Sequence, residues 1–123
     1  MNEMVLVDTS IWLDHLRTGY DRLIELLNEG RVLVHPFVIG ELACGNIKNR
    51  AEILALLHTL PLSTVAEAEE IIDFIDANRL MGKGLGYVDV HMLASAILSN
   101  VRLWTGDKPL ANTARVMGVD FEK

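Results

Sequence analysis

The sequence has a single cysteine, Cys44, among its 123 residues. One cysteine cannot form a disulfide within the chain, which excludes a small disulfide-stabilised secreted scaffold. We therefore expect a reducing, cytoplasmic setting. No apolar run approaches the roughly 18 residues that suggest a membrane span. The first residues also lack the basic region and long apolar stretch of a signal peptide, so we expect no membrane association.

Positive charge is scarce as well: 11 Lys and Arg face 17 Asp and Glu, a net charge of -6. This balance argues against a protein that coats nucleic acid by bulk electrostatic attraction. It does not exclude an enzyme that acts on nucleic acid, because a carboxylate-rich metal site is itself negative. Half of the residues are hydrophobic and no low-complexity segment is present. We expect one globular domain over residues 1–123.

Several common catalytic motifs are missing. The chain has no Gly-x-Ser-x-Gly nucleophile turn. Its glycine-rich segment at 81–87 is not a phosphate-binding loop, because Lys83 is not followed by Ser or Thr. The histidines show no zinc-site spacing, so we interpret them as structural or surface residues. They are His15, His35, His58 and His91.

Short apolar runs alternate with amphipathic segments along the chain. The runs predict strands at 4–7, 31–34 and 101–104, with further short strands at 62–65 and 119–121. Helices are expected at 9–16, 20–28, from 36, at 49–60, at 65–80, from 89 and up to 117. This alternation is typical of the α/β class. We predict a three-layer α/β/α sandwich with a central, mostly parallel sheet of about five strands.

The first strand runs straight into a carboxylate, Asp8, followed by Thr9 and Ser10. In an open parallel sheet, ligand sites gather just outside the carboxyl ends of the strands. Asp8 is therefore a candidate metal ligand or catalytic base. An equally good interpretation from this stretch alone is that Asp8 caps the next helix.

Three more acids occupy comparable positions. Asp107 follows the third main strand, and Asp89 opens a helix, where a capping role is the plainer interpretation. Glu41 lies among apolar neighbours in the helix after the second strand, unless it sits at the edge of that stripe and reaches water. If the sheet is parallel and its crossovers are right-handed, all four acids fall on the same edge.

Four like charges in one place repel, so the cluster makes sense mainly if cations fill it. A site built only from oxygen ligands favours hard ions such as Mg²⁺ or Mn²⁺. Such ions activate water and neutralise the charge of a phosphoryl group. Phosphodiester hydrolysis is the natural chemistry for this arrangement.

The acids stand in a series of local motifs that resembles the PIN-domain family, and more narrowly the VapC toxins of bacterial type II toxin–antitoxin pairs. The motifs are Val7-Asp8-Thr9-Ser10, the segment 40–45, Tyr87-Val88-Asp89 and the segment 103–107. The resemblance implies a PIN-like fold and an endoribonuclease that depends on Mg²⁺ or Mn²⁺. It also implies an RNA substrate such as tRNA or rRNA, a homodimer, and inhibition by a VapB-like antitoxin.

Carried over residue by residue, the resemblance implies an acidic catalytic and metal-binding site with two supporting hydroxyls. The acids are Asp8, Glu41, Asp89 and Asp107, and the hydroxyls are Ser10 and Thr105. Many relatives carry a further acid shortly after the fourth, whereas Lys108, Pro109 and Leu110 follow Asp107 here. Lys83 and Lys108 are candidate phosphate contacts, against the plainer interpretation that both are solvated surface lysines.

Two other classes stay open from the residues themselves. A phosphoacceptor or phosphatase-like domain could use Asp8, although Thr9 and Ser10 follow it where such sites generally carry another acid. A binding partner with a PIN fold and little or no catalytic activity is the second alternative. The four intact acids argue against it.

Overall fold

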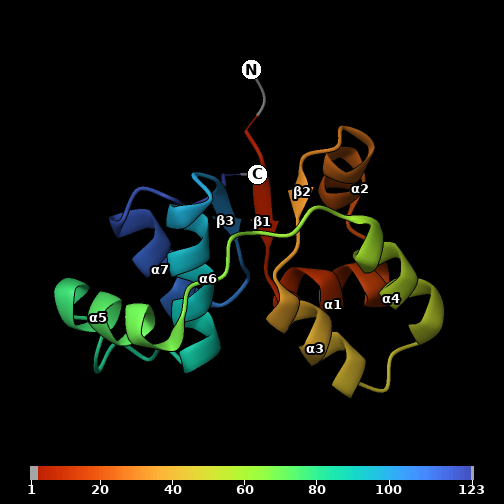
Figure 1. Cartoon of the computed structure of the whole chain (residues 1–123). Helices are drawn as coiled ribbons and strands as arrows, with labels where there is room; N and C mark the ends of the chain where they lie inside the picture. The colour runs from red at the N-terminus through yellow and green to blue at the C-terminus, as the bar shows by residue number, and fades with distance from the viewer. Residues whose placement is uncertain (1–2, 123) are drawn as a thin grey trace.

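The computed structural model describes residues 3–122 and shows seven helices and three strands in this range (Figure 1). The elements of the first half are β1 (Val5–Val7), α1 (Thr9–Thr18), α2 (Asp21–Asn28), β2 (Val32–Leu33), α3 (Pro36–Cys44) and α4 (Arg50–Thr59). Those of the second half are α5 (Ala68–Asn78), α6 (Tyr87–Leu98), β3 (Arg102–Trp104) and α7 (Lys108–Val116).

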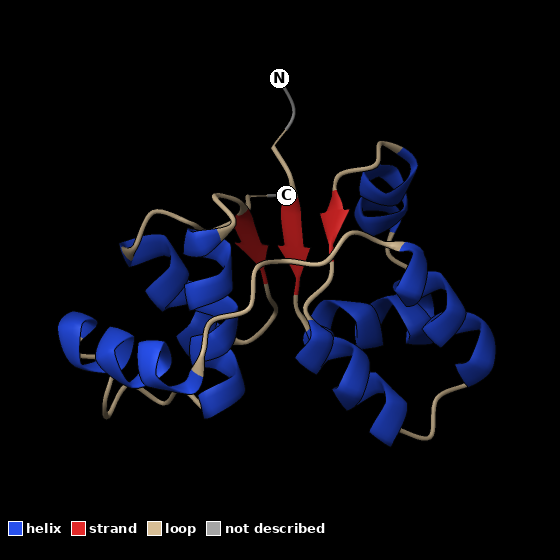
Figure 2. Ribbon diagram, viewed as in Figure 1, coloured by secondary structure: helices blue, strands red, loops and turns tan. Residues whose placement is uncertain are grey.

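The three strands form one parallel sheet in the order β2-β1-β3 (Figure 2). Leu6 in the central strand pairs with Leu33 on one side and Leu103 on the other. Because all three strands run the same way, their carboxyl ends meet at one edge of the sheet. The predicted α/β class with a parallel sheet is therefore confirmed.

The predicted number of about five strands is wrong, since the described residues contain three. The two missing strands are reduced to single parallel bridges, Val34 with Leu62 and Leu103 with Asp120. Next to the first bridge, the Thr64 amide donates to the Ser99 hydroxyl instead of continuing a strand ladder. A side-chain acceptor thus takes the donor that a longer strand would need.

The helices gather in two groups on either side of the strands (Figure 1). α1 to α4 lie beyond β2, while α5, α6 and α7 lie beyond β3. α6 packs on both β3 and α5, and α3 packs on both α1 and α4. Each of the two helices α3 and α6 is therefore held in place by two neighbouring elements. Within residues 3–122, none of the helices is both long and apolar enough to cross a bilayer.

Helix α5 is shorter than the segment 65–80 that the sequence predicts. Glu67 is its N-cap residue, and the Glu67 amide donates to the Glu70 carboxylate at 2.9 Å, a reciprocal arrangement that fixes a helix start. Arg79 ends it in a left-handed conformation with φ 53°. Ile72, the second apolar residue of the Ile71-Ile72 pair on this helix, is half exposed.

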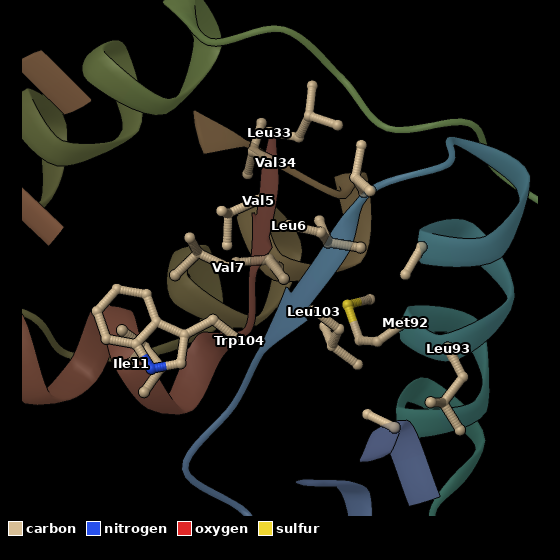
Figure 3. Close-up of a cluster of buried hydrophobic side chains, with 14 of the residues drawn as sticks. Val5, Leu6, Val7, Ile11, Leu33, Val34, Met92, Leu93, Leu103 and Trp104 are labelled. Atoms are coloured by element: carbon tan, nitrogen blue, oxygen red, sulfur yellow. The ribbon is translucent and has the colours of Figure 1, made fainter. Parts of the chain in front are cut away.

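The core is built around the fully buried strand β1, with apolar side chains from both helix groups packed against it (Figure 3). Trp12 and Trp104 are 1% and 3% exposed, so both tryptophans serve the core rather than the surface. Burying a large apolar side chain stabilises the fold by about 1.5–3 kcal/mol. This packing holds rigid the end of β1, from which Asp8 projects.

Candidate functional site

Asp8 occupies the point where the central strand ends and α1 begins. It is the N-cap residue of α1, but its side chain makes no capping hydrogen bond. Instead, its Oδ2 accepts hydrogen bonds from the hydroxyls of Ser10 at 3.1 Å and Thr105 at 2.8 Å. The side chain is buried, with the residue only 7% exposed. The sequence left open whether Asp8 is a site residue or a helix cap. In the structure, the Asp8 side chain makes no capping hydrogen bond to α1.

The two hydroxyls that hold Asp8 are themselves held by backbone amides. The Gly106 amide donates to Ser10 Oγ at 2.9 Å, and the Asp107 amide donates to Thr105 Oγ1 at 3.1 Å. The Asp8 amide in turn donates to the Trp104 carbonyl. These bonds lock the segments after β1 and β3 together. The orientation of the Asp8 carboxylate is therefore fixed by two strand ends at once.

Glu41 approaches this frame from α3. It is exposed, and its Oε1 accepts a hydrogen bond from the Thr9 hydroxyl at 2.6 Å. Glu41 thus reaches solvent, as one of the open interpretations held, and is also tied to the residue next to Asp8. Thr9 was not among the predicted site residues.

Asp89 and Asp107 each accept a backbone hydrogen bond at a helix start. The Gly86 amide donates to Asp89 Oδ2 at 2.8 Å, just before α6. The Leu110 amide donates to Asp107 Oδ2 at 3.1 Å, so Asp107 caps α7 with its side chain. In both acids, one carboxylate oxygen therefore accepts a hydrogen bond from a backbone amide at a helix start.

The electrostatics show that the four acids share one region. Burial raises the pKa of Asp8, the hydroxyls of Thr105 and Ser10 lower it, and the negative charge of Glu41 raises it further. Burial also raises the pKa of Asp89, with smaller contributions in the same direction from the charges of Asp107 and Asp8. Among residues 3–122, no Lys, Arg or His forms a salt bridge with any of them. The acids lie close enough for their charges to interact, and none of them has an ion-pair partner in the described part of the chain.

The donor chemistry of this cluster suits a hard divalent cation. Within the described residues, however, no three Asp, Glu, His or Cys side chains are arranged to hold one ion. In the range 3–122, one oxygen of each acid accepts no side-chain hydrogen bond: Asp8 Oδ1, Glu41 Oε2, Asp89 Oδ1 and Asp107 Oδ1.

The two buried histidines, His35 before α3 and His91 on α6, carry no positive charge at neutral pH. Burial lowers the pKa of His35 to about 4, helped by the proximity of His91, and burial lowers the pKa of His91 as well. His35 is the N-cap residue of α3, where its Nδ1 accepts from the Phe37 amide at 2.9 Å. Their structural role agrees with the sequence-based interpretation of the histidines.

Lys83 and Lys108, the candidate phosphate contacts, are both exposed. Lys83 lines a cavity of about 700 Å³ together with residues of α5 and α7, and none of the four acids lines it. In the described range, neither lysine forms an ion pair. Their involvement in substrate binding stays a prediction.

The fold and the acidic edge agree with a comparison to known protein families. The family model of the PIN domain matches residues 5–116, which is most of the chain. The protein therefore belongs to the PIN-domain family, and the resemblance predicted from the four motifs is confirmed.

Individual relatives narrow the placement within the family. The chain is 44% identical over 117 residues to Ribonuclease VapC32 of Mycobacterium tuberculosis, covering 94% of both proteins, in each of two strains. Among solved structures, PAE2754 from Pyrobaculum aerophilum has a TM-score of 0.59 at 14% identity, over 89% of this chain and 78% of the other. FitAcB from Neisseria gonorrhoeae has a TM-score of 0.59 at 18% identity, over 91% and 94%. The two structures support the fold.

Proposed function

We propose that the protein is a metal-dependent endoribonuclease of the VapC type, the toxin of a toxin–antitoxin pair. The observation that carries the proposal is Asp8, a buried carboxylate held by two hydroxyls beside three further acids. Among residues 3–122, no Lys, Arg or His forms an ion pair with it. The relative at 44% identity, Ribonuclease VapC32, supports RNA as the substrate. Hydrolysis of a phosphodiester bond is the chemistry that fits both.

Asp8, Glu41 and Asp89 would hold a Mg²⁺ or Mn²⁺ ion, and Asp107 would complete or tune the site. When bound, such an ion lowers the pKa of water and offsets the negative charge of the phosphoryl group. Ser10 and Thr105 fix the carboxylate of Asp8 by donating to the same oxygen. Since Asp107 also caps α7, its carboxylate serves the helix as well as the site.

The partners follow from the same placement in the family. We expect a VapB-like antitoxin that covers the acidic edge, a homodimeric toxin, and action in the cytoplasm where RNA is found. A reading frame beside the gene that encodes a DNA-binding head and an amphipathic tail would support the toxin assignment. Co-expression should then yield a stable complex in which RNA cleavage is suppressed.

The decisive experiment is cleavage of structured RNA by the purified protein. Cleavage should require Mg²⁺ or Mn²⁺ and stop with EDTA, and Asp8→Asn should lower it at least about 100-fold. Asp73→Asn, an exposed acid on α5, is the matched control and should cut like the parent. An Asp8→Asn protein that cuts as fast as the parent would refute the assignment.

A further inference from the structure

Four aromatic rings form a cluster between the starts of α3 and α6. The centroid of the His91 ring lies 4.6 Å from that of Phe37 and 4.7 Å from that of Tyr87. His35 adds a fourth ring, with its centroid 4.8 Å from Phe37 and 6.0 Å from His91. All four contacts are edge-to-face, with interplanar angles of 64° to 81°. We refer to these residues as the aromatic cluster.

The cluster has a buried half and an exposed half. The two histidines are 0% and 3% exposed, whereas Phe37 is 36% and Tyr87 50% exposed. The exposed rings are therefore backed by buried rings that limit their rotation. A ring held in this way presents its surface to solvent without losing further side-chain freedom on binding.

The exposed rings flank the acidic edge. Phe37 precedes Glu41 by four residues on α3, which places both on the same helix face. Tyr87 is the first residue of α6, and Asp89 reaches back to the Gly86 amide just before it. The contact between Phe37 and His91 thus joins the two helices that carry Glu41 and Asp89.

The charge of the region decides what can dock there. The chain has a net charge of -6, and no basic side chain of residues 3–122 pairs with the four acids. Phosphate contacts to the protein would therefore work against the local field. Neutral aromatic faces add no charge of their own, and every base has a ring face that can stack on them.

We propose that Phe37 and Tyr87, backed by His91, form a stacking platform for an unpaired base of the RNA next to the bond that is cut. This inference rests on the proposed ribonuclease function and adds a requirement to it. A base within a duplex already stacks on its neighbours, so only a nucleotide in a loop, bulge or single strand can use the platform.

The test compares leucine variants with aromatic ones in RNA cleavage. Phe37→Leu and Tyr87→Leu keep the apolar volume and remove the ring face, so each should raise KM about 5- to 20-fold with kcat nearly unchanged. Phe37→Tyr and Tyr87→Phe keep a ring and should retain the parent KM. Phe74→Leu, a half-buried phenylalanine on α5, is the matched control and should not change KM.

The probe is a synthetic RNA hairpin that the parent cuts in its loop, made with one abasic nucleotide at each loop position in turn. One position should raise the KM of the parent by a factor similar to that of the leucine variants. With that same abasic RNA, the KM of the Tyr87→Leu protein should rise little further, because this variant already lacks the stacking contact. If the effects of the abasic nucleotide and of Tyr87→Leu on KM were fully independent at every loop position, the platform would be overturned.

The remaining outcomes separate this inference from the proposed function. A parent protein that cuts no RNA overturns the proposed function, and the platform with it. A parent that cuts, together with leucine variants of unchanged KM, overturns the platform alone. Leucine variants that change the oligomeric state in gel filtration would show instead that the rings cover an interface between copies, which also overturns the platform.

Discussion

At the scale of single residues, the Asp8 carboxylate is the group whose position is most closely controlled. Two hydroxyls from the ends of β1 and β3 donate to its Oδ2, and two backbone amides hold those hydroxyls. Such supporting groups typically change metal affinity or activity 10–100-fold when they are removed. The role of Thr105 can therefore be measured separately from that of the acids.

Thr105→Val, which keeps the shape and removes the hydroxyl, should lower RNA cleavage about 10-fold or more. The physical reason is that Asp8 loses its 2.8 Å hydrogen bond and with it part of its orientation. The measurement is a titration of cleavage rate against Mn²⁺, where the variant should need more metal. Thr113→Val, whose hydroxyl donates only to the Pro109 carbonyl of its own helix, is the control. Equal Mn²⁺ dependence of the Thr105 variant and the parent would contradict the supporting role.

The sequence located the acids but not all of their contacts. Asp8 and Asp107 could be predicted because an acid that follows an apolar run is a local pattern. The Thr9 hydrogen bond to Glu41 spans 32 residues and depends on how α3 is rotated against α1, which no local pattern encodes. Tyr87 and His91 share a helix face at i, i+4 spacing, but their contact with Phe37 also needed the packing of α3 and α6.

At the scale of elements, the start of α7 combines a helix cap with a proposed site residue. Asp107→Asn keeps a good capping residue and removes the charge, so the Tm should change little while cleavage falls about 10-fold or more. Asp107→Ala loses both and should also lower the free energy of unfolding by about 1 kcal/mol. Urea unfolding and RNA cleavage of the two variants check this. If Asp107→Asn cut like the parent, Asp107 would be a cap only.

The start of α3 gives the protein a pH dependence. The pKa of His35 is about 4 in the folded protein, below its usual 6.5, so the unfolded chain binds the proton more readily. Stability from this group is complete above pH 6.5 and is lost as the pH falls toward 4. His35→Asn keeps a capping residue but removes the imidazole. Between pH 7 and pH 4.5, its free energy of unfolding should therefore fall by about 2 kcal/mol less than that of the parent. Urea unfolding at the two pH values measures this.

The control for this pH effect is His58→Asn, which changes an exposed histidine on α4. The His58 variant should lose as much stability as the parent over the same pH interval. If the His35→Asn protein showed the same pH dependence of stability as the parent, the His35 imidazole of the parent would be accessible to protons in the folded state.

The sequence predicted the main strands and the helices, yet it overestimated the sheet. Segments 62–65 and 119–121 have strand-like composition, and each forms one bridge. A strand needs a neighbour with free backbone groups over several residues, and near Leu62 the Thr64 amide binds the Ser99 side chain instead. Competition of this kind is decided by tertiary contacts and is invisible in a short window of sequence.

At the scale of the whole molecule, we expect the mutual repulsion of the clustered acids to oppose folding, and a bound cation to relieve it. At ten times its Kd, Mn²⁺ should stabilise the parent by about 1.4 kcal/mol, which raises the Tm by roughly 4–8 °C. Asp8→Asn should have a higher Tm than the parent in EDTA, because a buried charge is removed, and a smaller response to Mn²⁺. Calorimetry with and without Mn²⁺ tests both expectations. A parent Tm that ignores Mn²⁺ would contradict them.

The hydrogen bond from Thr105 to Asp8 joins residues 97 positions apart. During synthesis on a ribosome, Asp8 and Ser10 emerge long before the Thr105 hydroxyl and the strand β3 that complete the frame. A nascent chain that stalls before β3 therefore carries Asp8 without the frame that makes it useful. For an enzyme that cuts RNA, we expect this order to leave unfinished copies inactive until the last strand has been made.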